Sequence, residues 1–211
     1  MLLLFHCGQM VWNNIASEEE LERTSKSLES RGIEVIIANS SEDAKRKVMS
    51  LIPKGAEVMA VSSVTLDETG ISSEIENGDY VSVKKAVMSL NDDAQRAEAR
   101  RKSSHSEYVV GSVHAVTQDG QVLVASGSGS QLPFYTYSSK HVIWVVGTQK
   151  IVRNLDDAMK RLYEYILPLE SERIRKVYPS MSGSSVNKVL IFEKERPGRI
   201  KLVFVKERLG F

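Results

Sequence analysis

The chain has 211 residues, of which 42% are hydrophobic and 26% are charged, values that are ordinary for a soluble globular protein. Its 28 Lys and Arg residues nearly balance its 27 Asp and Glu residues, so the composition gives no reason to expect nucleic-acid binding. The single cysteine, Cys7, excludes an internal disulfide, a zinc finger, and an iron–sulfur cluster ligated by this chain alone, and it favours a reducing, cytoplasmic compartment. No run approaches the roughly 18–20 apolar residues that a membrane span requires.

The N-terminal stretch does not match a signal peptide. The apolar run MLLLF has no basic residue before it, and His6 and Gly8 soon interrupt it. Met10 is an alternative start of the chain. We find no internal repeat and no linker rich in Pro or Gly, so we expect one domain over residues 17–211, preceded by an extension over residues 1–16.

The first sixty residues predict helices that alternate with buried strands. Ser17 and Glu20 have the spacing of a capping box, and Gly32 marks a helix end. Helices are therefore expected over 17–31 and from Ser40 or Ser41 to Leu51, with strands over 33–38 and 57–61. Strand, helix and strand in this order predict a right-handed crossover and a parallel pair.

The stretch from 121 to 150 contains the most apolar strands of the chain. Residues 122–125 and 141–146 are predicted as strands buried on both faces, at the centre of a sheet. Asp119 and Gly120 give a strong hairpin signal between 107–117 and 121–125, so we expect a mixed sheet. Further along, the pattern predicts a helix that starts at Asn154 and breaks or kinks at Pro168, and then a hairpin of 188–193 with 199–205.

Three loops of small residues, at 62–65, 126–131 and 182–187, are the strongest functional signal. In an open α/β sheet, loops at the carboxyl ends of strands converge on one crevice, where their hydroxyl and N–H groups could hold a phosphate or a carboxylate. The alternative is that they are ordinary turns made of the commonest turn residues. The candidate ligand-binding residues are Ser62, Ser63, Thr65, Gly127, Ser128, Gly129, Ser130, Lys150, Ser184, Asn187 and Lys188.

Candidates for catalysis are few. Glu68 could act as a general base, although a capping box with Thr65 is the more ordinary interpretation, and Asp119 in the hairpin turn is a second weak candidate. The four histidines offer no set of metal ligands, so no metal site is predicted. Cys7 beside His6 lacks a third orienting group, and neither GxGxxG nor GxxxxGK[ST] occurs.

Four segments carry a familiar pattern. They are SSVTLDETGI from Ser62, YVVGSVHAVTQDGQVLVASGSGSQLP from Tyr108, HVIWVVGTQKIVRNLDDAM from His141, and GSSVNKVLI followed by PGRIKLVFVKERLGF at the end of the sequence. Together they resemble the LUD domain family, within the group of lactate-utilisation protein C (LutC/YkgG). The likeness runs from about residue 17 to residue 211.

The resemblance implies a fold similar to that of the NagB/RpiA/CoA-transferase superfamily, a three-layer α/β domain with a mixed sheet. Relatives act beside two iron–sulfur partner proteins that oxidise L-lactate to pyruvate, and a chain with one cysteine resembles the member without a cluster or other cofactor of its own. CoA-transferases of this superfamily attack with a glutamate in a Glu-Asn-Gly-like turn. Gln118 stands at that point here, before Asp119 and Gly120, so CoA transfer through a thioester is not expected.

The sequence thus leads to a cytoplasmic accessory or regulatory protein of lactate or related organic-acid utilisation, which binds a small anionic ligand at the Gly/Ser loops. Its partners would be iron–sulfur proteins, and a homo-oligomer is left open. One alternative is a stand-alone enzyme of the sugar-phosphate isomerase or formyltetrahydrofolate cycloligase type, which shares the fold. Another is a purely structural assembly subunit.

Overall fold

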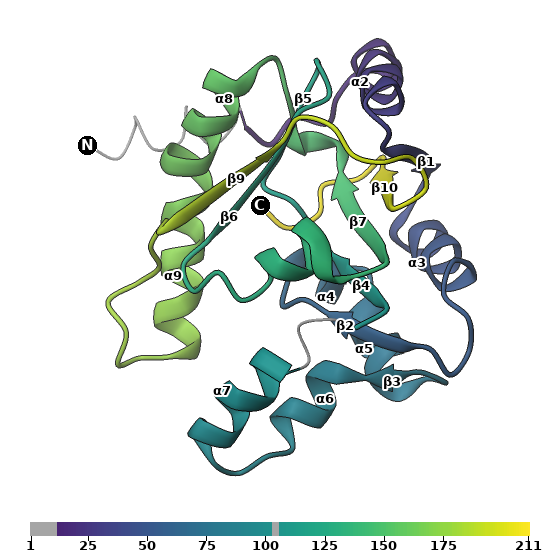
Figure 1. Ribbon diagram of the computed structural model, residues 1–211. Helices are drawn as coiled ribbons and strands as arrows, with labels where there is room; N and C mark the ends of the chain where they lie inside the picture. Colours follow the sequence, from purple (N-terminus) through teal and green to yellow (C-terminus); the bar gives the residue numbers. More distant parts are fainter. Residues whose placement is uncertain (1–11, 103–105) are drawn as a thin grey trace.

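Two β-sheets form the centre of the computed structural model, which describes residues 12–102 and 106–211 (Figure 1). The six-stranded sheet has the order β1-β10-β7-β4-β2-β3, and each neighbouring pair is parallel. Its strands are β1 (Glu34–Ala38), β2 (Glu57–Ala60), β3 (Val81–Ser82), β4 (Tyr108–Gly111), β7 (His141–Gly147) and β10 (Ile200–Val205). The four-stranded sheet has the order β8-β5-β6-β9 and contains β5 (Ala115–Thr117), β6 (Val122–Ser126), β8 (Ile151–Val152) and β9 (Lys188–Phe192).

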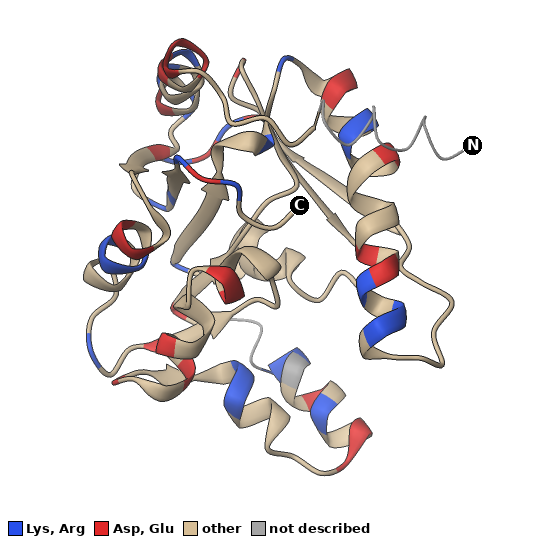
Figure 2. Cartoon of the chain, turned by 180° about the vertical axis from the view of Figure 1, so that it is seen from behind, with Lys and Arg blue, Asp and Glu red and all other residues tan. Residues whose placement is uncertain are grey.

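Helices cover the outer faces of the two sheets. In Figure 1, α8 and α9 run along one side beside β6 and β9, and α3 lies on the opposite side beside β10 and β1. Figure 2 shows that Lys, Arg, Asp and Glu are concentrated on these helices and the loops around the strands. The helices are α2 (Glu18–Ser30), α3 (Ser41–Ser50), α4 (Val64–Glu68), α5 (Ile71–Asn77), α6 (Val83–Met88), α7 (Asp93–Lys102), α8 (Leu155–Lys160) and α9 (Leu167–Val177), with shorter or π-type turns η1 (Phe134–Ser138), η2 (Thr148–Lys150) and η3 (Arg161–Ile166).

The alternation of side chains along β7 explains how the sheets stack. Trp144 and its neighbours two residues away, Val142 and Val146, belong to a core shared with β6, β9 and α2. Ile143 and Val145 point the other way, into a core with α3, α4 and α5. A third core fills the space between the four-stranded sheet and α8–η3. The α/β class predicted from the sequence is confirmed, and its strands are distributed over two sheets.

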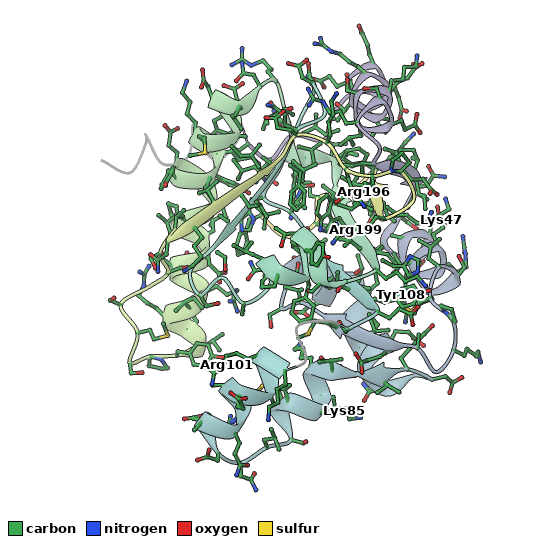
Figure 3. The ribbon with its side chains drawn as sticks, in the orientation of Figure 1. Lys47, Lys85, Arg101, Tyr108, Arg196 and Arg199 are labelled. Atoms are coloured by element: carbon green, nitrogen blue, oxygen red, sulfur yellow. The ribbon has the colours of Figure 1, made fainter. Side chains whose placement is uncertain are left out.

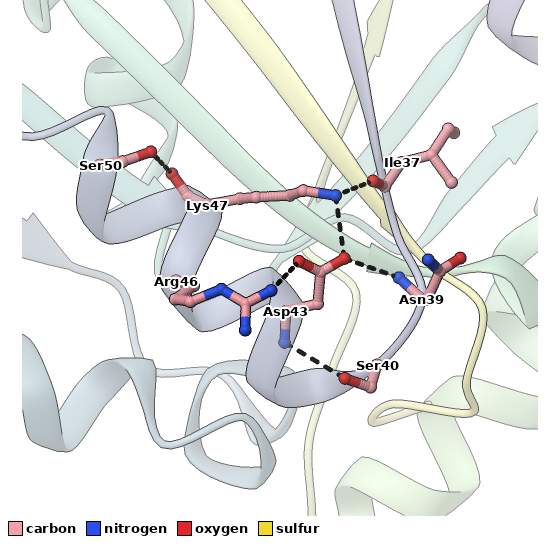
Figure 4. A network of polar contacts seen from close by, with 7 residues as sticks. All are labelled: Ile37, Asn39, Ser40, Asp43, Arg46, Lys47 and Ser50. Carbon is pink, nitrogen blue, oxygen red and sulfur yellow. Dashed lines mark hydrogen bonds and ion pairs between the residues drawn. The ribbon is translucent and has the colours of Figure 1, made fainter.

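The N-termini of α2 and α3 begin as the sequence predicts. Ser17 and Glu20 form both bonds of the capping box before α2. At α3, the Ser40 hydroxyl accepts from the Asp43 backbone N–H at 3.2 Å. Figure 4 shows that Asp43 also accepts from the Lys47 ammonium at 2.9 Å, and that Lys47 donates to the carbonyl of Ile37 in β1 at 2.6 Å. This network ties the start of the helix to the strand before it.

Three predictions of strand pairing are wrong. Residues 188–193 and 199–205 do not form a hairpin: β9 pairs antiparallel with β6, and β10 lies between β1 and β7. β6 and β7 do not share one sheet, although both are buried. β1 and β2 are parallel strands of one sheet but are not a pair, because β10, β7 and β4 lie between them. The predicted mixed pairing is found in the four-stranded sheet, where β5 pairs antiparallel with β6 and parallel with β8. The cause is physical, because an apolar run fixes that a strand is buried but not which strand it pairs with.

Two helix predictions also need correction. α4 begins two residues earlier than the capping-box spacing indicates, with Ser63 at the N-cap and no side-chain bond there, so Thr65 and Glu68 do not form that box. The sequence predicts a break or a kink at Pro168, and the helix capped by Asn154 does not break there: it continues through the π-helical turn η3 into α9. The π-helical turn ends just before Pro168, which has no N–H to donate. No helix in residues 12–102 or 106–211 is long and apolar enough to cross a membrane.

Arg199 holds η1 against the six-stranded sheet (Figure 3). Its guanidinium donates to the carbonyl oxygens of Phe134 and Tyr135 at 3.1 and 2.9 Å, and it also pairs with Glu195 at 2.6 Å. These contacts satisfy carbonyl groups of a short turn that has few bonds of its own. They also fix the aromatic ring of Tyr135 beside Trp144, with the ring centroids 5.6 Å apart. η1 is thereby held next to the loop at 126–131.

Candidate functional site

A cavity of about 710 Å³ opens at the carboxyl ends of β2 and β4 and beside β6. Its volume lies within the roughly 300–1,000 Å³ of typical small-molecule sites. All three Gly/Ser loops contribute to its wall, α6 and α7 line it on one side, and α9 lines it on another. Eight of the predicted residues line it: Ser62, Ser63, Thr65, Gly127, Ser128, Ser130, Lys150 and Ser184.

The other three predicted ligand residues support the loops from outside the cavity wall. The Asn187 side chain donates to the carbonyl of Gly127 at 3.2 Å, which joins the third loop to the second. Gly129 has a φ of +84°, and a Cβ placed on it would lie 2.8 Å from Cδ of Lys188. Glycine is needed at this position both for the left-handed backbone and for the close approach of the lysine.

The loop at 126–131 uses part of its polar capacity internally. The Ser126 hydroxyl accepts from the Gly129 N–H and donates to the Gln131 amide oxygen, both at 2.8 Å. Gln131 in turn donates to the carbonyl of Ala125 at 3.2 Å. The N–H of Gly129 is therefore not directed at a ligand, in agreement with the turn interpretation for that residue. The hydroxyls of Ser128 and Ser130 bond to each other at 3.0 Å and line the cavity.

Lys150 provides the buried charge of the cavity. Its side chain is 2% exposed, and its ammonium donates to three neutral oxygens. They are Oγ1 of Thr65 at 3.0 Å, Oγ of Ser112 at 3.1 Å and the carbonyl of Val113 at 3.3 Å. Burial, aided by the nearby Arg161 cation and opposed by Glu68, lowers the pKa of Lys150 to about 7. The ammonium is thus held by dipoles rather than by a carboxylate.

The position of Lys150 follows from how the chain passes between the two sheets. β7 ends at Gly147, η2 carries Lys150, and β8 begins the second sheet at the next residue. A second connection between the two sheets joins β4 to β5 through Ser112. The hydrogen bond between Lys150 and Ser112 therefore links the two crossings. Side chains at such a junction face the gap between the diverging sheets, and the cavity occupies this gap.

Two residues next to this junction were not predicted as part of the site: His114, which is partly buried, and Arg161, which is buried. His114 lines the cavity, and its Nδ1 accepts from the Ala125 N–H at 3.1 Å. Burial, together with the charges of Lys150 and Arg161, lowers the pKa of His114 to about 3, so the ring is neutral. Arg161 is fully buried, donates to the carbonyl of His114 at 2.6 Å, and lies 5.3 Å from the centre of the Tyr165 ring. Within the described residues, its Nε and Nη2 atoms have no hydrogen-bond partner.

Residues 209–211 close one side of the cavity. The carbonyl of Leu209 accepts from Oγ1 of Thr65 at 3.2 Å and from the Gln149 side chain at 2.8 Å. The N–H of Gly210 donates to the carboxylate of Glu68 at 2.6 Å. Glu68 therefore holds this segment in place, and it does not belong to the lining of the cavity.

Asp119 lies away from the cavity, in the exposed turn between β5 and β6. Its carboxylate pairs with Arg23 of α2 at 3.2 Å, and its carbonyl accepts from Arg31 at 2.7 Å. These contacts give it a structural role between the turn and α2. The structure brings neither predicted catalytic candidate, Glu68 nor Asp119, to the cavity wall.

Three basic side chains line the outer part of the cavity, and each is paired with a glutamate. Lys84 contacts Glu76 at 2.9 Å. Arg101, on the side of α7 that faces α9 in Figure 3, contacts Glu98 at 2.7 Å. Arg173 of α9 contacts Glu170 at 2.7 Å. Their charges are largely neutralised, so Lys150 is the cation that dominates the inner part.

The described residues contain no group of three or more His, Cys, Asp and Glu side chains that could hold a metal ion. His141 stacks on Tyr108 with the ring centroids 4.6 Å apart, at the opposite end of β7 from Lys150. His6, Cys7 and His105, which the sequence analysis considered, lie outside the described residues.

Comparison with known proteins identifies the family. A family model of the LUD domain matches residues 21–205. The chain belongs to the LUD domain family. This LUD domain chain is also similar to a solved structure of a DUF162 family protein from Deinococcus radiodurans, at a TM-score of 0.56 and 9% identity over 91% of this chain and 99% of that chain. At such low identity this likeness establishes the fold alone.

A second solved structure, eIF2B beta from Chaetomium thermophilum, matches at a TM-score of 0.38 and 17% identity, over 58% of this chain and 42% of that chain. This score is too low to relate the two proteins further. A search of curated proteins returned no match for the LUD domain chain.

Proposed function

We propose that this LUD domain protein binds a small organic anion, of the carboxylate class to which lactate belongs, with Lys150 as the principal cation. One observation carries the proposal: a buried ammonium faces a cavity of about 710 Å³ and has only neutral oxygens as hydrogen-bond partners. A charge in that setting is stabilised by an anion more strongly than by dipoles alone.

The hydroxyl-rich loops supply the remaining contacts of a small carboxylate. Ser62 and Ser63 precede α4, Ser128 and Ser130 belong to the loop at 126–131, and all four line the cavity. Hydroxyls both donate and accept, so they suit a ligand that carries a hydroxyl or carbonyl group beside its carboxylate. These contacts support a hydroxy acid or an oxo acid over a simple fatty acid.

We further propose an accessory or regulatory role in the utilisation of lactate or a related organic acid, beside iron–sulfur partner proteins. Membership of the LUD domain family supports this role. A chain with a single cysteine cannot ligate such a cluster alone, so electrons from an organic acid would pass to partners. Co-purification from a native extract should recover iron–sulfur proteins, and repeated failure to recover any would contradict the accessory role.

The experiment for ligand binding compares two lysines that differ in position. Lys150→Met removes the buried cation, and Lys188→Met makes the same change at a lysine that does not line the cavity. Calorimetric titration with L-lactate, pyruvate and inorganic phosphate should show binding in the parent protein. The Lys150→Met affinity should fall roughly tenfold or more, because hydrogen bonds to charged groups are worth about 1.5–3 kcal/mol. Equal affinities for the two variants would refute the assignment of Lys150.

An enzyme of the isomerase or cycloligase type is less well supported. Isomerisation needs a carboxylate or histidine that exchanges protons within reach of the ligand. Glu68 and Asp119 do not line the cavity. Two carboxylates do: Glu170 is engaged by Arg173, and Asp67 is exposed on α4. His114 is held neutral with Nδ1 already bonded. Glu170 and His114 are thus engaged in bonds within the protein, which supports anion binding over isomerisation.

A further inference from the structure

We propose that Lys150 is an amine nucleophile that forms an imine with a 2-oxo acid bound in the cavity. The inference rests on the proposed function and names its ligand class more closely: the anion carries a carbonyl carbon next to its carboxylate. The observation behind it is geometric. Nζ of Lys150 lies at the cavity wall between two hydroxyls, with no carboxylate among its three hydrogen-bond partners.

The two hydroxyls differ in what they can do for the amine. Oγ1 of Thr65 donates its own proton to the carbonyl of Leu209 at 3.2 Å, so it can only accept from Lys150. In the described residues, the Ser112 hydroxyl does not donate to a carbonyl group, and it lies 3.1 Å from Nζ. A serine hydroxyl can turn from accepting to donating. When Lys150 loses a proton, its lone pair can therefore accept a hydrogen bond from Ser112 or attack a ligand.

The electrostatic surroundings favour the neutral amine. Burial and the Arg161 cation lower the pKa of Lys150 to about 7, while Glu68 acts in the opposite direction. About half of the molecules then carry a neutral amine at neutral pH, against roughly one in 2,500 for a lysine with an unperturbed pKa of about 10.4. Desolvation and a neighbouring cation are the two ways in which proteins activate lysine for attack on carbonyl groups.

The chemical step balances without an oxidant or a reductant. The Nζ lone pair attacks the carbonyl carbon, a C–N bond forms, and the carbonyl oxygen takes a proton that the amine releases through the Ser112 hydroxyl. The resulting carbinolamine loses its hydroxyl as water after one further protonation, and the nitrogen lone pair forms the C=N bond. In total, one amine, one 2-oxo acid and one proton give one iminium ion and one water.

The neighbouring charges suit the product as well as the reactants. The iminium nitrogen is positive and lies directly beside the carboxylate of the former 2-oxo acid, so the two charges compensate each other inside the protein. Arg161 adds positive potential behind His114 and has two nitrogen atoms without hydrogen-bond partners in the described residues. A ligand with a carboxylate next to its carbonyl group is therefore held more strongly than an uncharged ketone or aldehyde.

Reductive trapping tests the imine directly. The full chain is incubated with pyruvate and sodium cyanoborohydride, and the modified lysines are located by peptide mass mapping. We expect one saturable adduct at Lys150, formed faster than adducts at exposed lysines such as Lys140 and Lys188. Lys150→Arg should abolish that adduct, and Lys140→Arg, at an exposed lysine that pairs with Glu107, should leave it unchanged. L-lactate has a hydroxyl group in place of the 2-oxo group, so it should slow formation of the adduct by competition.

The dependence of trapping on pH and on Ser112 gives a second readout. The rate at Lys150 should reach half its maximum near pH 7, with Arg161, Glu68 and His114 as the charged or titratable groups that act on the amine. Exposed lysines should keep accelerating toward pH 10. Ser112→Ala should slow trapping several-fold with little change in the affinity for pyruvate, because its hydroxyl moves a proton.

The outcomes separate the two proposals. If calorimetry shows that pyruvate binds but no adduct forms at Lys150 in the parent protein, the imine is refuted and the anion site stands. If neither pyruvate nor L-lactate binds, the anion site is refuted and the imine with it. Adducts spread evenly over exposed lysines also refute the imine. Mapping in the parent protein decides the matter even if Lys150→Arg fails to fold.

Discussion

Lys150 shows how the fold sets the chemistry of one side chain. Its four-carbon stem passes from the crossing between the sheets to the cavity wall, where burial disfavours the charged form. Three neutral acceptors stabilise the ammonium form of Lys150, and the low dielectric surroundings favour the neutral amine, so both forms are present near neutral pH. A lysine on the surface of the same domain has neither influence. The residue is thus prepared both to attract an anion and to react as an amine.

The lowered pKa of Lys150 predicts how stability varies with pH. Between about pH 7 and pH 10, the unfolded chain binds a proton at this lysine that the folded chain does not, so the free energy of unfolding should rise with pH. Lys150→Met should lack this rise, and Lys188→Met should retain it. Urea denaturation midpoints across that range provide the measurement. Parallel curves for Lys150→Met and the parent protein would contradict the prediction.

The lowered pKa of His114 predicts how the stability of the fold varies at acidic pH. Its pKa is about 3 in the folded chain and near 6.5 when unfolded, so stability should be lost as pH falls below about 6.5. His114→Asn keeps an acceptor for the Ala125 N–H but cannot be protonated in this range. We expect the variant to lose less stability than the parent protein between about pH 6.5 and pH 4. A steeper acid loss in His114→Asn would show that the ring titrates differently.

At the scale of single elements, the segment 209–211 depends on one glycine. Gly210 has a φ of +59°, and a Cβ on it would lie 2.6 Å from Oγ1 of Thr65. Gly210→Ala should therefore displace the segment from Thr65, lower the free energy of unfolding by about 1–3 kcal/mol, and weaken anion binding. Thermal melting and calorimetric titration provide the two measurements.

Gly198→Ala is the matched control for that substitution. Gly198 has a φ of +89°, and a Cβ there would meet nothing within 4 Å. It therefore incurs the cost of a left-handed alanine, on the order of 1 kcal/mol, without a clash at the cavity. If Gly210→Ala and Gly198→Ala bind the anion equally well, the segment 209–211 has no part in the site.

Elements with local signals could be predicted from the sequence, and their pairing could not. The capping box at Ser17, the cap at Ser40 and the hairpin at Asp119 depend on neighbours within four residues, and the structure has all three. β9 and β10 are five and six residues of similar apolar character, and each pairs with strands more than fifty residues away in the sequence. Long-range pairing depends on which faces pack, and no local pattern records that.

The candidate site was predictable to the same extent. Small residues after buried strands placed the loops at 62–65 and 126–131 at the cavity, the small residues of 182–187 added the loop between α9 and β9, and Lys150 joined them because it follows β7 closely. Arg161 and His114 were missed, since an arginine in an amphipathic helix and a histidine in a strand segment are usually exposed. The apolar residues around Arg161 in η3 were a signal that its position is buried.

For the whole molecule, stability depends on how the two sheets pack. Trp144 of the six-stranded sheet meets Phe192 of the four-stranded sheet edge to face, with the ring centroids 5.0 Å apart. Both belong to the core between the sheets. Phe192→Ala should lower the free energy of unfolding by about 3–5 kcal/mol, because it removes a buried aromatic ring and leaves a cavity.

Chemical denaturation followed by tryptophan fluorescence measures this loss. Tyr137→Ala is the control, since its ring is 90% exposed and its removal should change stability by less than about 0.5 kcal/mol. A loss below 1 kcal/mol in Phe192→Ala would mean that the contact between the sheets contributes little to the fold.

The hydrogen bond between Lys150 and Ser112 spans the two places where the chain crosses from one sheet to the other. Any local unfolding that separates the two sheets must therefore also separate the groups that hold an anion. By linkage, a bound anion then makes such openings rarer in proportion to its concentration over its dissociation constant. Amide hydrogens of β5 and β6 should exchange with deuterium more slowly when pyruvate is present, although these strands lie outside the six-stranded sheet. Slower exchange in these strands would therefore report that the cavity is occupied.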